Sequence, residues 1–267
     1  MTRNPFESSA AAKTEGQQQS GAASSFLAEA REEFREFVMR QEFPCVGARA
    51  AFNSGSYIVA VYDELASDAA TTALSRDLFD FTRSGMREAS EYATFVAVFR
   101  RPEGLAAASP GRAEARPSDF ELAFEQDLWN QLQKLHDLDA PQFGWDPMAS
   151  SDPADPQFSF SFAGQALYVI GMHPNSSRAA RRFRWPAMVF NPHEQFEKLR
   201  AEGKWKRMQQ TIRERDLQLQ GSINPMLSDF GEVTEARQYS GRAVEADWRA
   251  PFEPAKSPAA GKCPFHH

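Results

Sequence analysis

Cysteine is scarce in this chain of 267 residues, where Cys45 and Cys263 are the only two. Two cysteines cannot build a disulfide framework, and they cannot supply a zinc or iron–sulfur site that takes all its ligands from cysteine. Such low usage is typical of proteins from reducing compartments. We therefore expect a cytoplasmic location.

Long apolar runs and an excess of positive charge are also missing. No stretch approaches the ~18 apolar residues that a membrane span needs, and the N-terminus lacks the apolar segment of a signal peptide. The net charge of -6 argues against a nucleic-acid partner. Neither a membrane nor nucleic acid is therefore expected among the partners.

Several common catalytic motifs are absent as well. The chain has no Walker loop, no G-x-G-x-x-G dinucleotide fingerprint, no G-x-S-x-G nucleophile elbow and no H-E-x-x-H zinc motif. Phenylalanine, in contrast, is abundant, with 22 residues against 5 Trp and 5 Tyr. This excess indicates a bulky core or a flat apolar pocket, and composition does not separate the two.

The composition divides the chain into three parts. Residues 1–24 carry almost no large apolar side chains and cannot offset the entropy of ordering, so we expect a disordered N-terminal segment. Residues 25–246 form the one expected domain. Residues 247–267 are rich in Pro and Ala and are expected to form an extended C-terminal tail.

Short apolar runs alternate with helical periodicity across the domain. We expect strands over 56–62, 92–99, 158–162, 165–171 and 187–190. Helices are expected from about Ser25, after Asp68, from a capping box of Ser118 and Glu121, after Asn191-Pro192, and again after Gly203. The pattern predicts an α+β fold: a single domain with one mixed or antiparallel sheet of about four to five strands packed with helices.

Residues 171–231 concentrate imidazole, guanidinium and turn residues. His173 directly follows an expected strand, whereas His193 stands at an expected helix start with Asn191 as a capping candidate. Neither histidine has the partner spacing of a zinc pair, so a structural role for each remains an alternative.

Four arginines fall within the seven residues from Arg178 to Arg184. Guanidinium groups bind carboxylate and phosphate bidentately, so Arg178, Arg181 and Arg182, with Asn191 nearby, are the candidate cofactor-binding residues. The alternative is a solvated basic surface.

The two cysteines differ in their setting. Cys45 precedes a run of small residues that suits a short helix, and a cysteine at a helix N-terminus gains thiolate character. It could be a ligand or a nucleophile, or simply a small buried hydrophobe. Cys263 belongs to a Cys-Pro dipeptide near the C-terminus, where a flexible tail is the alternative to a ligand.

These segments carry a family resemblance. The matching pieces are Phe43-Pro44-Cys45, the His173-Pro174 to Phe183 stretch, Phe190-Asn191-Pro192-His193 to Arg200, Gln220-Gly221-Ser222-Ile223-Asn224-Pro225 and Tyr239-Ser240-Gly241. Together they resemble the YqcI/YcgG family over roughly residues 25 to 265.

The resemblance implies a haem-dependent N-oxygenase. Members of the family are associated with N-hydroxylation of a guanidine-bearing amino acid derivative in guanitoxin formation and with oxidation of a lysine side-chain amine. For this chain we therefore expect a monooxygenase that N-hydroxylates an amine or guanidine of an amino-acid-like small molecule. Haem b would be its cofactor, and dioxygen and an external electron donor its further partners.

The resemblance supplies no ligand set, so the axial ligand is ranked by chemistry. Thiolate favours O–O cleavage, which places Cys45 first, with His173 second and His193 and Cys263 after them. The guanidinium groups of Arg178, Arg181 and Arg182 could hold haem propionates or a substrate carboxylate. A non-catalytic haem sensor or carrier, or a small-molecule-binding protein without haem, remains the alternative function.

Overall fold

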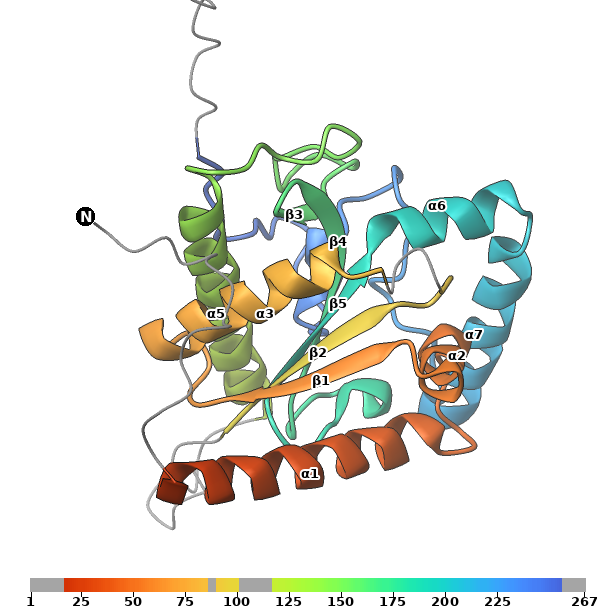
Figure 1. Ribbon diagram of the computed structural model, residues 1–267. Helices are drawn as coiled ribbons and strands as arrows, with labels where there is room; N and C mark the ends of the chain where they lie inside the picture. The colour runs from red at the N-terminus through yellow and green to blue at the C-terminus, as the bar shows by residue number, and fades with distance from the viewer. Residues whose placement is uncertain (1–16, 86–89, 101–116, 256–267) are drawn as a thin grey trace, which may run out of the picture.

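A five-stranded sheet forms the centre of the protein in the computed structural model, which describes residues 17–85, 90–100 and 117–255 (Figure 1). The strands follow the order β1-β2-β5-β4-β3. Helices pack against the sheet, so the α+β prediction with one mixed sheet is confirmed. Among the described helices, none combines the length and the apolar character that spanning a membrane requires.

The strands coincide closely with the predicted apolar runs. Their bounds are β1 Tyr57–Tyr62, β2 Thr94–Phe99, β3 Phe160–Phe162, β4 Gln165–Met172 and β5 Ala187–Pro192. Only β1 and β2 run parallel, joined through helix α3 (Asp68–Arg83), and the other three pairs are antiparallel. This single parallel pair makes the sheet mixed.

The central strand β2 is buried on both faces. Phe95, Ala97 and Phe99 belong to one core cluster, whereas Val96 and Val98 belong to the other. Successive side chains of a strand point to opposite faces, so an uninterrupted apolar run requires cover on both sides.

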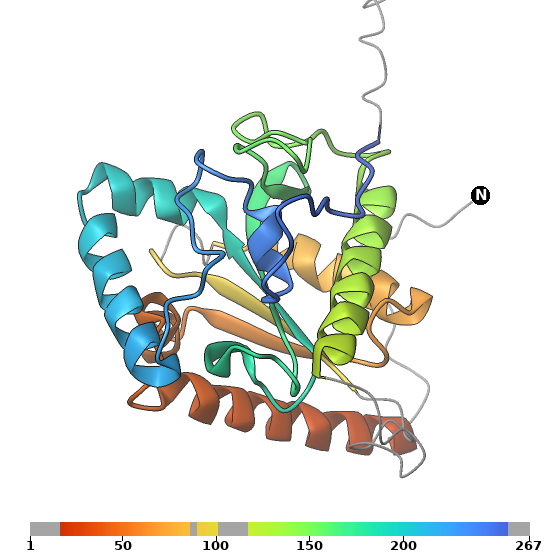
Figure 2. The same ribbon diagram turned by 180° about the vertical axis from the view of Figure 1, so that it is seen from behind.

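Different helices cover the two faces of the sheet. Helices α3 and α5 (Pro117–Asp139) pack against the face that carries Phe95. Helices α1 (Gln17–Met39) and α2 (Val46–Ser54) pack against the opposite face, which we call the α1/α2 face (Figures 1 and 2). Most phenylalanines of the described residues belong to these two core clusters.

Three helix starts differ from the predictions. Helix α1 begins at Gln17 rather than near Ser25, since the Gln and Ala residues that precede Ser25 are good helix formers. Helix α3 is capped by the Ser67 side chain, which accepts from the Ala70 N–H, and Asp68 is its first residue. The predicted capping box of Ser118 and Glu121 is wrong, because α5 already begins at Pro117, a residue suited to a first helical position.

Helices α6 (His193–Ala201) and α7 (Trp205–Gln220) follow the last strand, separated at Gly203 as predicted. Gly203 adopts a φ of 71°, a left-handed conformation that ends α6. In both views α7 lies beside α2, and the two helices are in contact (Figures 1 and 2).

The C-terminal segment returns across the sheet to α5. It contains a short helix, α8 (Ala236–Tyr239), which the sequence did not predict. Part of the predicted tail is integrated into the domain: residues 247–255 are irregular, but Phe252 is only 5% exposed and packs against Trp129 and Trp145. Residues 256–267 of that tail, and residues 1–16 of the predicted N-terminal segment, lie outside the described residues.

Candidate functional site

A cavity of about 260 Å³ lies on the α1/α2 face of the sheet. Its apolar wall is formed by strand and helix side chains, among them Phe34, Phe52, Val96, Ile170, Met172 and Val189. Helix α7 closes the outer side with Met208 and Ile212, which remain half-exposed. The volume is close to the lower end of the ~300–1,000 Å³ typical of small-molecule sites.

Cys45 lies on the wall of this cavity, at the start of α2. It is the N-cap residue of the helix, and its Sγ accepts from the Ala48 N–H at 3.4 Å. Burial nevertheless raises the pKa of the Cys45 thiol, while the helix N–H groups and Arg181 partly offset that rise. In the protein without a metal the thiol is therefore neutral, although a bound metal would deprotonate it.

The two candidate histidines are separated by the fold. His193, the first residue of α6, lines the cavity, packs against Phe230 at 4.3 Å between ring centroids, and is 6% exposed. Burial lowers the pKa of His193, which keeps its imidazole neutral, the form that binds metals. His173 lies outside the lining and stacks on Phe124 of α5 at 4.4 Å.

A buried carboxyl group lies beside His193. Oε2 of Glu235 is 3.9 Å from the His193 Nε2, and Oε1 accepts from the Tyr239 hydroxyl at 2.6 Å. Burial raises the pKa of Glu235 to about 8. Glu235 also lines the cavity, so this side of the site holds an imidazole and a carboxyl that are both largely uncharged at neutral pH.

The arginine cluster does not act as a unit. Arg178 is bound to Asp216 of α7 at 2.6 Å and to Ser222, and it is 8% exposed. Arg182 is exposed and donates to the Ser176 and Ser177 carbonyls. Arg184 pairs with Glu29 and Glu33 of α1.

Arg181 is the exception in this cluster. Its guanidinium lines the cavity, and Nη1 donates to the carbonyls of Gly171 at 3.2 Å and Tyr239 at 3.0 Å. It is 7% exposed, and within residues 17–85, 90–100 and 117–255 no carboxylate lies within 4.0 Å of it. Arg181 therefore brings a buried positive charge to the cavity without a bonded counter-ion.

Two glycines make room for this guanidinium and its contacts. A Cβ at Gly171 would lie 2.6 Å from a methyl of Leu128 and 2.8 Å from the Tyr239 carbonyl oxygen. A Cβ at Gly241, whose φ is 85°, would lie 3.0 Å from the Arg181 Cδ. Larger residues at either position would disturb the packing around Arg181.

Several uncharged polar groups also face the cavity. Asn191 does not cap α6; its Oδ1 accepts from the Thr94 hydroxyl at 2.9 Å, and its Nδ2 donates to the Tyr168 carbonyl. The Gln195 Oε1 and the Trp205 Nε1 are buried and have no hydrogen-bond partner within the protein. Buried polar atoms are rarely left unpaired, so these two are free to bind a ligand.

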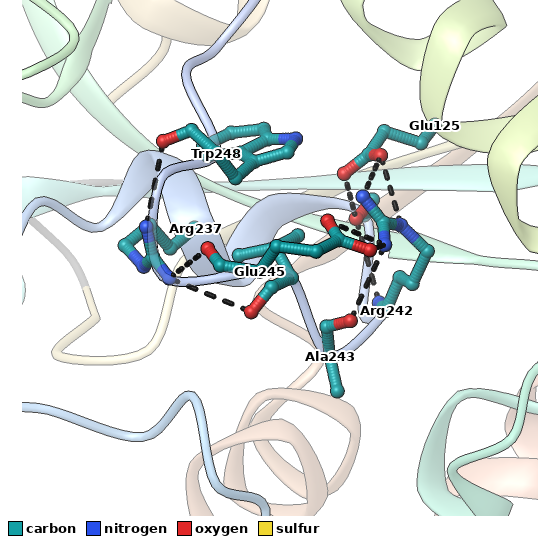
Figure 3. Close-up of polar contacts among 8 residues, drawn as sticks. Glu125, Arg237, Arg242, Ala243, Glu245 and Trp248 are labelled. Atoms are coloured by element: carbon teal, nitrogen blue, oxygen red, sulfur yellow. Dashed lines mark hydrogen bonds and ion pairs between the residues drawn. The ribbon is translucent and has the colours of Figure 1, made fainter.

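The C-terminal segment that carries Glu235 and Tyr239 is fixed to α5 by a buried ion pair. Figure 3 shows the guanidinium of Arg242 facing the carboxylate of Glu125, with Glu245 on its other side. Oε1 of Glu125 also accepts from the Ser240 hydroxyl at 3.0 Å. The ion pair thus holds the Tyr239–Gly241 backbone against Arg181.

Cys263 lies outside the described residues, so its relation to the cavity is not defined. No cluster of three or more His, Cys, Asp or Glu side chains suited to a metal ion occurs in the described part of the chain. Of the predicted site residues, the cavity brings together Cys45, Arg178, Arg181, Asn191 and His193.

The family model of the YqcI/YcgG family matches residues 34–253. The chain belongs to the YqcI/YcgG family. No curated protein and no solved structure matches it. The matched region of the YqcI/YcgG protein contains the whole cavity wall.

Sequence reasoning missed three residues of the site in this family member. Glu235, Tyr168 and Gln195 stand alone in their segments, with no acidic or polar partner at a diagnostic spacing. Gln195 did lie within a motif used for the resemblance, but its unpaired oxygen appears only once the strands and α6 are assembled.

Proposed function

We propose that this protein is a haem-dependent N-oxygenase that N-hydroxylates an amine or guanidine group of an amino-acid-like small molecule. One observation carries the proposal: a single apolar cavity in a YqcI/YcgG chain has both Cys45 and His193 on its wall. Cysteine thiolate and histidine imidazole are the side chains that most often bind haem iron.

The residues of the cavity suit a haem. The apolar wall, which includes Phe34, Phe52 and Ile170, suits the flat macrocycle. The haem iron needs only one axial ligand from the protein. The volume of about 260 Å³ is small for this cofactor. Haem binding would therefore require helix α7 to move away from the cavity at the half-exposed residues Met208 and Ile212.

The axial ligand would come from one side of the cavity. His193 is the better prepared of the two candidates, since its imidazole is neutral, whereas Cys45 must lose a proton on binding. Cys45 remains the alternative because thiolate favours O–O cleavage. His173 stacks on Phe124 and lies outside the cavity lining, so it ranks below both.

The bound haem would supply the activation of dioxygen, with electrons from an external donor. The chain itself would position the substrate. Gln195 offers an unpaired acceptor oxygen to an N–H group of an amine or guanidine. Glu235, with its pKa raised to about 8, can take up or release a proton near neutral pH at Oε2, beside His193.

The absorption spectrum of the purified protein, before and after haem reconstitution, tests the cofactor. A Soret band is expected, and its absence after reconstitution would exclude haem. The ferrous carbon-monoxide spectrum then identifies the ligand. His193→Ala should abolish an imidazole-type band if His193 binds iron, and Cys45→Ser should abolish a long-wavelength band if Cys45 does. His173→Ala is the matched control and should retain the wild-type band.

Turnover separates an oxygenase from a haem carrier. The haem-loaded protein is incubated with a reductant, dioxygen and amino acids that carry amine or guanidine side chains. A product heavier by one oxygen atom at nitrogen supports the proposal. Reductant consumption without any oxygenated product, across amine and guanidine substrates alike, would support a sensor or carrier instead.

A further inference from the structure

The guanidinium of Arg181 is buried at the cavity and forms no ion pair with a carboxylate of the described residues. It is 7% exposed and lines the cavity, and its hydrogen bonds go to uncharged groups: two backbone carbonyls that accept from Nη1, and the hydroxyl of Tyr168. A buried cation without a paired anion loses its hydration with little compensation. The missing partner is therefore an anion that enters the cavity.

The neighbouring charges do not supply that anion. Asp216 is the carboxylate that interacts electrostatically with Arg181, but its Oδ2 is bound to Arg178 at 2.6 Å and to the Asn224 N–H at 2.9 Å. The carboxyl group of Glu235 accepts from the Tyr239 hydroxyl at 2.6 Å, lies beside His193 and forms no ion pair with Arg181. Arg181 thus differs from Arg178, which has a bonded carboxylate, and from Arg182, which lies outside the cavity lining.

The surroundings also define the kind of anion. Much of the cavity wall is apolar, with Ile170 and Met172 of β4 and Phe52 of α2 among its residues. One buried guanidinium without a carboxylate partner within the described ranges, in a largely apolar cavity, matches a single negative charge on an apolar body, whereas phosphate would need more donors and more charge. The carboxylate is the monoanion whose two oxygens match the guanidinium fork.

We propose that the cavity is a binding site for an apolar monocarboxylate, whose carboxylate group is bound by Arg181. The side chain is already immobilised by Gly171, Tyr239 and Gly241, so binding costs it little further entropy. The proposal goes beyond the proposed N-oxygenase, because it assigns a ligand group to Arg181 whether or not haem is present.

Calorimetric titration with octanoate and its neutral analogue octanamide tests the proposal. Octanoate should bind wild type at least about 10-fold more tightly than octanamide, since the pair differs in the charge-assisted hydrogen bonds. Arg181→Gln should weaken octanoate by about 10- to 100-fold and leave octanamide unchanged. Arg182→Gln, which changes a guanidinium outside the cavity lining, is the matched control and should bind octanoate as wild type does.

A second measurement needs no variant and so is independent of folding defects. Octanoate should slow alkylation of Cys45 by iodoacetamide in wild type, because both residues line the same cavity, and octanamide should slow it less. The Cys45 peptide is followed by mass spectrometry. Equal binding and equal protection by octanoate and octanamide, or tighter binding of inorganic phosphate than of octanoate, would overturn the proposal.

The carboxylate could belong to a free small molecule or to a haem propionate, and haem content distinguishes these sources. If Arg181→Gln loses haem and octanoate binds only the haem-free protein, Arg181 holds a propionate. If haem content is unchanged and octanoate binds the haem-loaded protein, Arg181 holds a small carboxylate. If neither preparation takes up haem but octanoate still binds through Arg181, the N-oxygenase proposal fails while the carboxylate site stands.

Discussion

Nη2 of Arg242 lies 2.7 Å from Oε2 of Glu125, and the two side chains are 9% and 8% exposed. The pair joins the C-terminal segment to α5, more than a hundred residues earlier in the chain. Nε of Arg242 donates to the same carboxylate oxygen at 2.9 Å. Removing one partner leaves an uncompensated charge in a buried place.

Arg242→Met should therefore lower the free energy of unfolding by about 3–5 kcal/mol. Urea denaturation measures the loss. The matched control is Arg35→Ala, which removes an exposed ion pair with Glu32 and should cost less than about 1 kcal/mol. Equal losses in the two variants would show that the buried pair contributes no more than a surface pair.

Gly171→Ala should destabilise the protein more than the addition of one methyl normally does. The added Cβ would meet Leu128 at 2.6 Å, Phe124 at 2.7 Å and the Tyr239 carbonyl oxygen at 2.8 Å. Overpacking of this kind costs about 1–3 kcal/mol, and here it also displaces the carbonyl that accepts from Arg181. Thermal unfolding monitored by circular dichroism measures the change.

Gly144→Ala is the control for that substitution. Nothing lies within 4 Å of a Cβ built at Gly144, and its φ is not in the left-handed region. This variant should be as stable as wild type or slightly more stable, since alanine restricts the unfolded chain. A loss comparable to that of Gly171→Ala would contradict the steric explanation.

The strands were predictable because their signal is local. Tyr57 to Tyr62 and Thr94 to Phe99 are apolar runs of strand length. The burial of the second run on both faces follows from the run itself. The start of α1 was missed because Gln17 and its neighbours favour helix without an apolar periodicity.

The site was predictable only as a list of residues. Cys45 was expected at a helix start, and the structure places it at the N-cap of α2. The division of the arginines was hidden, because it depends on Asp216, 38 residues from Arg178, and on Tyr239, 58 residues from Arg181. Sequence spacing alone carries no information on such distant pairs.

Residues 1–24 are predicted to be dispensable, whereas Phe26 is not. Phe26 is 9% exposed, packs edge-on against Trp185 at 5.3 Å between centroids, and lies under the Arg100 guanidinium at 4.4 Å. Deleting 1–24 should leave the melting temperature nearly unchanged. Phe26→Ala in the full chain should cost about 3 kcal/mol. A large loss on deletion alone would show that the segment before Ser25 contributes to the folded state.

The stability of the protein should decrease as the pH rises toward neutrality, in part through Asp139. This residue is 3% exposed at the end of α5, and its Oδ1 accepts from the Ala163 N–H at 2.9 Å. Burial raises the pKa of Asp139 to about 7, whereas the unfolded value is about 3.9. Between these values the folded state holds a proton that the unfolded state releases, so stability falls with rising pH and is constant above about 7.

Asp139→Asn tests this contribution, because the amide oxygen can still accept from Ala163 while the titration is removed. Urea denaturation of both proteins at pH 5 and pH 8 is the measurement. Wild type should lose roughly 1–3 kcal/mol more than Asp139→Asn between the two pH values, at about 1.4 kcal/mol for each pKa unit. Asp137→Asn, which changes an exposed carboxylate of the same helix, should follow the wild-type pH dependence. Parallel curves for wild type and Asp139→Asn would show that Asp139 is already ionised in the folded protein at pH 5.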